Sequence, residues 1–419
     1  MQLTPVEQAM LAGAESPVVA EALDYIVQFG EAFDAPRLVD ITYCHYPAEM
    51  SIYEGQVEGL CEYAQRGGRV RVPTTTSTLS CDLERPESTG IPAELAVLQS
   101  KVEAAHRSMG IMETYTCTPQ HLGFIPPFGS LNALVESSAI VYCNSVLGAR
   151  TNRGGLFTRF SAITGKYPLM GYLLSENRCG THLFQVDVPA DRLASYDAWC
   201  ALGFHIGGIV GSGVPVISGV KPVRQDWLLG LGAALATSGA VTLFHIPGVT
   251  PEARTKAEAF QGSTPTEKHR VTVKDLNAVY EKLNTMAMGS AIDFVTLGCP
   301  HYTLEQLRIL AGILSGRRVA DGVRFWVCTN RMTRSQAEYS GYVKAIEDAG
   351  ALVVADTCPV ESHLRSSTCR EHGLSVPSVE AMVTDSAKMA RYVGDLIGCH
   401  TVLASIEECV KSALTGRWR

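Results

Sequence analysis

The sequence predicts an α/β fold with largely parallel sheets. Strand-like apolar runs alternate with helical runs in the first half of the chain, and the second half repeats this rhythm. The chain has 419 residues, of which 46% are hydrophobic and 18% charged, so it is globular rather than disordered. This length is too great for one small core and predicts two or three domains.

The first half supplies strands and helices in turn. We expect a strand over residues 37–43, a helix over 54–68 that ends at glycine, and a strand over 69–75. A long helix over 92–110 comes next, and a strand-like run over 111–117 follows it.

The sequence of the second half of the chain predicts three strands, and each ends near a polar residue or a cysteine. They cover residues 291–299, 322–330 and 350–358, and helices over 303–314 and 334–350 separate them. This order of elements is typical of a parallel sheet.

A polar stretch over residues 247–275 interrupts the pattern, because it is rich in proline, threonine and charge. We therefore divide the chain into a first α/β region over 1–250, a linker or active-site excursion over 251–275, and a second α/β region over 276–419.

Charge and hydropathy exclude several classes of protein. A net charge of −7 without a basic stripe argues against a nucleic-acid partner. The N-terminus lacks a signal-peptide pattern, and Thr4, Pro5 and Glu7 predict a capped helix there. The uncharged stretch Trp227–Phe244 contains Gly, Ala, Ser and Thr, which favours a buried helix followed by a strand over a membrane span.

The thirteen cysteines carry the strongest chemical signal. An odd number without a signal peptide predicts reduced thiols and a cytoplasmic protein. Cys299 and Cys358 each end a predicted strand and precede a proline, and Cys117 ends a strand-like run with a proline two residues on. Because ligands of open α/β sheets bind beyond the carboxyl ends of strands, these three thiols are candidate metal ligands.

The cysteine pattern alone leaves three interpretations open. Proline donates no backbone hydrogen bond and also follows a cluster cysteine in bacterial ferredoxins, which favours an iron–sulfur cluster. A cluster held by three thiolates would leave one iron open, as a Lewis acid for a substrate hydroxyl. The alternatives are zinc, which in catalytic sites usually draws on histidine or carboxylate, and three buried structural cysteines.

Two polar stretches are candidates for substrate binding. Asn144, Ser145 and Arg150 belong to one loop, in which the guanidinium offers a planar fork to a carboxylate or phosphate. Thr74 and Thr75 belong to a hydroxyl-rich stretch that can hold an anion or cap a helix. The alternative for the first loop is a solvated arginine.

Ser386 and Lys388 stand near a predicted helix start, where the lysine can meet an anion. His45, His121 and His301 each follow a strand-like run and, with Lys388, are weak acid–base candidates. A lone histidine is more often structural, but His121 and His301 lie near candidate cluster cysteines.

Taken together, these motifs resemble a known family. The stretches TCTPQH, NSVLGARTN, TLGCPHYTLEQL, FWVCTNR, ADTCPV and TDSAKMARY occur in this order and are similar to the large subunit of aconitase X. The resemblance covers nearly the whole chain. It implies an aconitase-like, multi-domain α/β core and a hydro-lyase with an iron–sulfur cluster held by three cysteines, here Cys117, Cys299 and Cys358. Cluster nuclearity varies within the family.

The resemblance also implies a partner. Fused members of the family carry a small swivel domain that supplies a catalytic serine, and we find no such segment in this sequence. A separate small subunit is therefore expected to bring that serine, so no catalytic base is expected on this chain.

Two substrates are implied by the family: cis-3-hydroxy-L-proline in bacterial members and mevalonate 5-phosphate in archaeal ones. Residues 125–145 and 39–47 look more like the bacterial branch, so we expect conversion of hydroxyproline to pyrroline-2-carboxylate. Arg150 and the hydroxyls of Thr74, Thr75 and Ser145 would hold its carboxylate. A zinc-dependent hydrolase and a non-catalytic or regulatory subunit are the alternatives from other classes.

Overall fold

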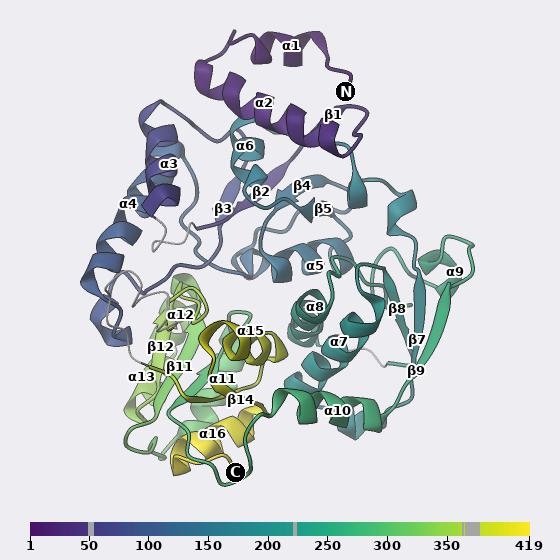
Figure 1. Ribbon diagram of the computed structural model, residues 1–419. Helices are drawn as coiled ribbons and strands as arrows, with labels where there is room; N and C mark the ends of the chain where they lie inside the picture. The colour runs from purple at the N-terminus through teal and green to yellow at the C-terminus, as the bar shows by residue number, and fades with distance from the viewer. Residues whose placement is uncertain (49–53, 221–223, 363, 365–377) are drawn as a thin grey trace.

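The computed structural model describes residues 1–48, 54–220, 224–362, 364 and 378–419 (Figure 1). The described cysteines are free thiols, and Cys369 lies outside the described residues. The three larger sheets have parallel strand pairs, which confirms the prediction of an α/β fold with largely parallel sheets.

A four-stranded parallel sheet organises the N-terminal part, in the order β3-β2-β4-β5. Its strands are β2 (Tyr43–Tyr46), β3 (Thr74–Thr76), β4 (Leu131–Leu134) and β5 (Arg150–Arg153). The helices of this part are α1 (Pro5–Leu11), α2 (Pro17–Ala32), α3 (Glu54–Gln65), α4 (Ala93–Met109), α5 (Ser137–Ser145) and α6 (Phe157–Thr164). β1 (Leu38–Asp40) and β6 (Lys166–Pro168) form an antiparallel pair. Thr4 and Glu7 form the capping box expected at α1.

The middle part contains a three-stranded parallel sheet in the order β8-β7-β9. Its elements are β7 (His182–Val186), α7 (Tyr196–Val210), β8 (Pro215–Ser218), α8 (Gln225–Ser238), α9 (Lys256–Ala259), β9 (Glu267–Val271) and α10 (Val273–Leu283). α9 and β9 thus fall within residues 251–275.

A five-stranded parallel sheet organises the C-terminal part, in the order β12-β11-β10-β13-β14. Its strands are β10 (Phe294–Leu297), β11 (Arg324–Thr329), β12 (Leu352–Ala355), β13 (Ala381–Thr384) and β14 (His400–Leu403). The helices are α11 (Leu304–Leu314), α12 (Arg331–Tyr339), α13 (Tyr342–Asp348), α15 (Ala387–Ile397) and α16 (Ile406–Thr415).

The helices α5, α8 and α15 lie between the three parts in Figure 1 and join them. Val141 of α5, and Ala387 and Ala390 of α15, belong to the same buried cluster as α7 and α8. α7 approaches α8 so closely that a Cβ on Gly203 would meet the carbonyl oxygen of Leu231. This tight packing fixes α5 and α15, whose first residues border the site described below.

Two predicted strands are shorter than expected, and one is wrong. Residues 37–43 divide between β1 and the first residue of β2, and only the end of 69–75 is extended, in β3. Residues 111–117 form no strand: Met112 makes one bridge to Thr75, and Tyr115 then turns the chain with a φ of 38°. The hydroxyl of Thr114, rather than a backbone carbonyl, accepts the hydrogen bond from the backbone N–H of Thr76.

The stretch Trp227–Phe244 forms most of α8, as expected for a buried helix, but the strand expected after it is reduced to a bridge between Val216 and His245. No helix among the described residues combines the length and the apolar character needed to cross a bilayer.

Candidate active site

Cys117, Cys299 and Cys358 line one cavity of about 100 Å³ between the N-terminal and C-terminal parts. Cys299 follows β10 and Cys358 follows β12, so both lie beyond the carboxyl edge of the five-stranded sheet. Cys117 comes from the irregular segment after α4. The structure therefore brings together the three cysteines that the sequence singled out, although only two of them follow strands.

A glycine sets the path of the chain into Cys299. Gly298 has a φ of 91°, a conformation that favours glycine, and a Cβ there would fall on the backbone carbonyl of Cys328. The loop after β10 can therefore lie directly against β11, which directs Cys299 into the cavity.

His301 joins the three cysteine-bearing segments. Its backbone N–H donates to Cys117 Sγ at 3.2 Å, and it lies two residues after Cys299. Its Nε2 is 3.1 Å from the carbonyl oxygen of Thr357, which can only accept, so Nε2 carries the proton. Nδ1 then accepts from the hydroxyl of Thr116 at 3.1 Å. Burial lowers the pKa of His301 to about 4, which keeps the ring neutral.

A buried ion pair lies in the same cavity. Lys388 Nζ is 2.7 Å from Glu136 Oε1 and 3.0 Å from the Ser137 hydroxyl. Burial alone would raise the pKa of Glu136, but the ammonium of Lys388 and hydrogen bonds from Ser138 hold it at about 2. Burial opposes the charge of Lys388 too, and the carboxylate outweighs it and raises the pKa. Both partners are therefore charged at neutral pH.

A second carboxyl group, on Glu361, borders the cavity and accepts a hydrogen bond from the Thr78 hydroxyl at 3.0 Å. Burial and the nearby charge of Glu136 raise the pKa of Glu361 to about 8. Glu136 and Glu361 also border an adjoining chamber of about 230 Å³. The other residues that line this chamber are Pro47, Ala48, Gln56, Ser77, Val135 and Leu156.

The three thiols suit a metal-containing group. Burial raises the pKa of Cys117, Cys299 and Cys358, so a thiolate at any of them needs a cationic partner. Lys388 offers some compensation but is already paired with Glu136. Three thiolates in one small cavity are the soft ligand set that iron–sulfur clusters and zinc prefer.

Among the described residues, no group of three or more His, Cys, Asp and Glu side chains is placed to hold one metal ion. The thiolates of a cluster bind different irons and need not converge on one point. Three thiols that border one cavity are thus compatible with a cluster.

Of the polar residues predicted from sequence, Lys388 lines the cavity and Ser386 stands next to it. The Ser386 hydroxyl caps α15, accepts from the Met389 backbone at 3.2 Å, and also forms a hydrogen bond with the Cys299 thiol. Thr74 and Thr75 are buried in β3, where the protein uses their hydroxyls: Thr74 donates to a backbone carbonyl at 2.8 Å.

The histidine candidates other than His301 do not line the thiol cavity. His45 Nδ1 lies 2.8 Å from the Thr75 hydroxyl, which also contacts the Tyr43 hydroxyl. His121 lies in a short 3₁₀ turn, Pro119–Leu122. Burial lowers the pKa of both histidines to about 4, so both rings are neutral at neutral pH.

Arg150, Asn144 and Ser145 lie at the opposite edge of the four-stranded sheet. Arg150 begins β5, whereas Glu136 follows β4, the parallel strand beside it. Arg150 donates to a backbone carbonyl at 2.8 Å, Asn144 binds the guanidinium of Arg178 at 3.0 Å, and Ser145 accepts from a backbone N–H at 2.9 Å. The structure places them away from the lining of the thiol cavity, and their role in substrate binding stays a prediction.

Sequence reasoning missed several residues that line the cavity: Thr78, Glu136, Ser138, Glu361 and Tyr392. Glu136 follows β4 by two residues, so the strand-end rule that found the cysteines would also have found it. The others carry no comparable signal.

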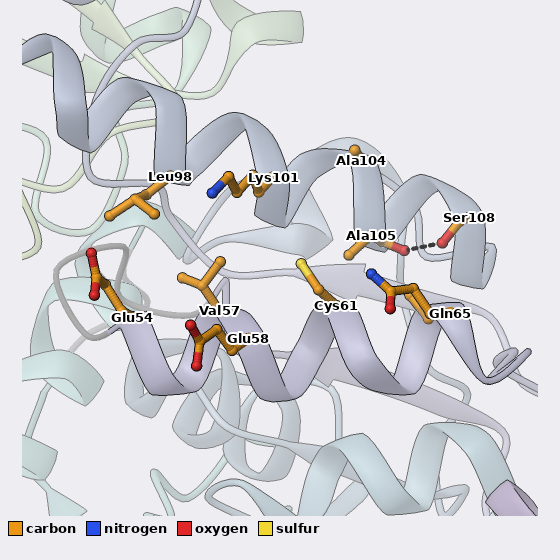
Figure 2. Close-up of a pocket in the computed structure, with 11 residues that line it drawn as sticks. Glu54, Val57, Glu58, Cys61, Gln65, Leu98, Lys101, Ala104, Ala105 and Ser108 are labelled. Carbon is orange, nitrogen blue, oxygen red and sulfur yellow. Dashed lines mark hydrogen bonds between the residues drawn. The ribbon is translucent and has the colours of Figure 1, made fainter.

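A larger groove, of about 690 Å³, runs between α3 and α4 (Figure 2). Cys61 and Lys101 face each other across it, but it contains none of the predicted site residues. The convergence of thiols and paired charges, rather than volume, identifies the thiol cavity as the candidate active site.

The fold and this site define an α/β enzyme whose cavity combines three thiols, two carboxyls and a lysine. The chain matches three family descriptions: "Aconitase X first domain" over residues 1–176, "Aconitase X second domain" over 180–281 and "Aconitase X third domain" over 292–415. It belongs to the aconitase X family, which confirms the resemblance seen in its motifs.

Named relatives extend this result. The chain is 36% identical to the phosphomevalonate dehydratase large subunit of Methanothermobacter thermautotrophicus, over 96% of each chain. It is 33% identical to the cis-3-hydroxy-L-proline dehydratase of Hypocrea jecorina, over 99% of this chain and 69% of that one. The crystal structure of Thermococcus kodakaraensis aconitase X, in its holo-form, superposes with a TM-score of 0.86 at 30% identity, over 99% of this chain and 100% of that one. The chain is thus a dehydratase, an enzyme of the hydro-lyase class.

Proposed function

We propose that this chain is the large subunit of an iron–sulfur-dependent dehydratase that converts cis-3-hydroxy-L-proline to pyrroline-2-carboxylate. The charge of the candidate active site carries this proposal. Among the described residues, the thiol cavity and the adjoining chamber are lined by two glutamates and one lysine, Glu136, Glu361 and Lys388, and by no arginine.

This charge pattern suits an imino acid better than a phosphate ester. Phosphate groups in proteins are generally met by arginine or by several cations. Hydroxyproline instead carries one carboxylate and one ring ammonium, which match Lys388 and the carboxyl oxygens of Glu136 and Glu361. The chamber of about 230 Å³ is also small and partly apolar, as suits a five-membered ring.

The proposed cofactor follows from the thiols and the family. Aconitase-like proteins are generally iron–sulfur dependent, and Cys117, Cys299 and Cys358 would hold the cluster here. When bound, it would supply a Lewis acid next to the substrate hydroxyl.

The chain's own residues bind and orient the substrate. Lys388 attracts the carboxylate, and Glu136 fixes the position of that ammonium group at the start of α15. Val360 and Tyr392 line the thiol cavity and help to exclude water from it.

The base is assigned to a partner. Relatives of this chain are named large subunits, which implies a small subunit. We propose that this small subunit is a swivel domain and that its serine removes the Cα proton. We also keep the prediction of a cytoplasmic location, which rests on the free thiols.

A second candidate is dehydration of mevalonate 5-phosphate. One observation favours it: the chain matches 90–100% of the length of phosphomevalonate dehydratase large subunits, against 69–70% of the hydroxyproline dehydratases. Under this candidate, Lys388 and Arg150 become the candidate phosphate ligands, and of these Lys388 lines the cavity.

One experiment separates the two candidates. The chain is co-expressed with its small subunit, purified without oxygen and assayed on both substrates side by side. Turnover of the imino acid with no turnover of the phosphate ester supports the main proposal. Turnover of the phosphate ester alone would contradict it and establish the second candidate, and no turnover of either substrate by iron-loaded protein would remove both.

A further inference from the structure

We propose that Arg331 and Asp82, which lie outside the candidate active site, position the thiol of Cys358. The inference deepens the proposed function and rests on it in one respect, because Cys358 is the third proposed cluster ligand. The geometry itself does not depend on what the thiols bind. It involves residues 77–89, which we call the strap and which cross from the N-terminal part to the C-terminal sheet.

The strap pairs with the segment that carries Cys358. The backbone N–H of Leu79 donates to the carbonyl of Asp356 at 2.7 Å, and the N–H of Cys358 donates back to the carbonyl of Leu79 at 3.2 Å. Leu79 and Thr357 thus form a parallel bridge. The path of the chain into Cys358 is therefore set by a segment nearly 280 residues earlier in the sequence.

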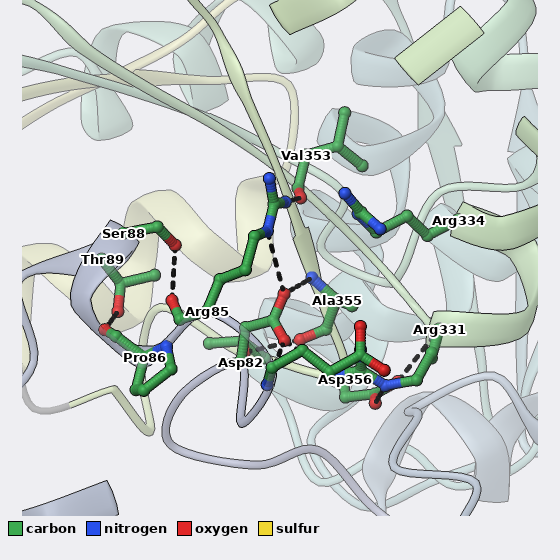
Figure 3. A network of polar contacts seen from close by, with 12 residues as sticks. Asp82, Arg85, Pro86, Ser88, Thr89, Arg331, Arg334, Val353, Ala355 and Asp356 are labelled. Carbon is green, nitrogen blue, oxygen red and sulfur yellow. Dashed lines mark hydrogen bonds and ion pairs between the residues drawn. The ribbon is translucent and has the colours of Figure 1, made fainter. Parts of the chain in front are cut away.

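Arg331 binds both the strap and the segment that carries Cys358, as Figure 3 shows. Its backbone N–H and its Nε donate to the two oxygens of Asp356, at 2.7 and 3.0 Å. Its terminal nitrogen donates to Asp82 Oδ1 at 2.8 Å, and the backbone N–H of Ala355 donates to the other oxygen of Asp82 at 3.3 Å. One guanidinium thus bridges a carboxylate of the strap and a carboxylate of the Cys358 segment.

The turn at Asp356 needs this support. Asp356 has a φ of 59°, a left-handed conformation that costs a non-glycine residue free energy. It precedes Cys358 by two residues, so relaxation of this turn moves the thiol. Asp356 and Asp82 are also buried, with 4% and 1% of their surface exposed. Without Arg331 their carboxylates would lose the cation that they share.

A guanidinium is required because of its shape. Its Nε–H and one terminal N–H point in fixed directions toward Asp356 and Asp82, and its other terminal nitrogen pairs with Glu84, whereas an ammonium is a point charge on a flexible stem. Lysine at position 331 can reach one carboxylate but not both in the same geometry. Partial rescue by lysine is therefore the signature of positioning, as opposed to a general need for positive charge.

The test measures thiol reactivity in the metal-free, full-length chain. Wild type, Arg331→Met and Arg331→Lys are treated with N-ethylmaleimide, and mass spectrometry follows Cys358 and Cys117 separately. We expect alkylation of Cys358 in Arg331→Met to be about tenfold faster, and that of Cys117 to change less than about twofold. Arg331→Lys should fall between wild type and Arg331→Met.

Arg66→Met is the matched control. Arg66 pairs with the carboxylates of Glu21 and Glu62, whereas Arg331 pairs with three, and its side chain is 35% exposed against 28% for Arg331. It lies away from the thiols, so its loss should leave the ratio of the two alkylation rates unchanged. If Arg66→Met changes the ratio of the Cys358 and Cys117 alkylation rates as much as Arg331→Met does, the effect is a general loss of stability and the proposal is overturned.

Asp82→Asn is the second variant. If Arg331→Met does not fold, the alkylation rate of Cys358 in Asp82→Asn tests the proposal instead. This substitution keeps the shape of the side chain and removes the charge that Arg331 bridges. Wild-type reactivity of Cys358 in this variant overturns the proposal. A selective rise in Cys358 reactivity supports it even if reconstituted wild type binds no iron, in which case the proposed function fails and the positioning stands.

Discussion

The backbone N–H of His301 donates a hydrogen bond to the sulfur of Cys117 at 3.2 Å and so connects positions 184 residues apart. The ring of the same histidine bonds to Thr116 on one side and to Thr357 on the other. A single residue therefore sets the spacing of three segments, each with one thiol. Hydrogen bonds to sulfur also tune the potential of a bound cluster.

Replacing His301 with asparagine tests this role. The backbone N–H remains, but the ring's bonds to Thr116 and Thr357 are lost, so the free energy of unfolding should fall by about 1–3 kcal/mol. Urea denaturation measures this change, and iron analysis should show a reduced content. His106 is the control, because it is equally buried and neither ring nitrogen has a partner among the described residues. His106→Asn should keep its iron; equal iron loss in both variants would count against the role of His301.

Replacing Lys388 with methionine tests the buried ion pair. Glu136 is then left without its cation, and breaking a buried pair from one side costs about 3–5 kcal/mol. The double variant Lys388→Met, Glu136→Gln should recover most of that stability but no activity, because the proposed carboxylate-binding group is still missing. Thermal unfolding and turnover measure the two effects. Activity in the double variant would remove Lys388 from substrate binding.

Acid should destabilise the protein through Glu136. Its pKa of about 2 lies below the ordinary value of 4.5, so its contribution to stability is full above pH 4.5 and is lost as the pH falls toward 2. The contribution is on the order of 3 kcal/mol. Denaturation curves at pH 6 and pH 3 should therefore differ less in Glu136→Gln than in wild type. The same difference in both proteins would contradict the shifted pKa.

Replacing Cys299 with serine tests the cluster. The variant should lose visible absorption, iron and activity after anaerobic reconstitution, because serine cannot replace a soft thiolate. Cys328→Ser is the matched control, since Cys328 is fully buried in β11 but does not line the cavity. It should keep its absorption. Wild-type iron and activity in Cys299→Ser would sink the assignment of the ligands.

The alternation of elements sufficed to predict the fold class. Three strands of the C-terminal sheet, β10, β11 and β12, lie where the sequence placed them, whereas β13 and β14 were not predicted. Apolar runs ending in Cys299 and Cys358 are continuous, and such runs are typical of strands buried on both faces. The run that ends in Cys117 misled the prediction, because the hydroxyls of Thr114 and of Thr76 in β3 accept hydrogen bonds from the backbone of the opposite segment. Local pattern does not reveal such bonds, since Thr76 and Thr114 are far apart in sequence.

The candidate site was only partly predictable. The cysteines could be picked out from sequence by their residue type and by a nearby proline. Glu361 and Thr78 are hydrogen-bonded but lie 283 positions apart in the sequence, and no motif marks either of them. Arg150 and Lys388 looked equivalent as cations in sequence. The direction of the strands separates them: Arg150 begins a strand and Lys388 follows one, which puts them at opposite ends of their sheets.

The order in which the ribosome makes these segments has a consequence for maturation. Cys117 and Glu136 emerge early, Cys299 and Cys358 much later, and Lys388 after all of them. Until Lys388 is made, Glu136 has no countercharge, and until the strap meets the segment of Cys358, the third thiol has no fixed place. If Cys117, Cys299 and Cys358 hold a cluster as proposed, all three ligands and the Glu136–Lys388 pair exist only once the polypeptide is nearly complete, so cluster loading would follow synthesis of most of the chain.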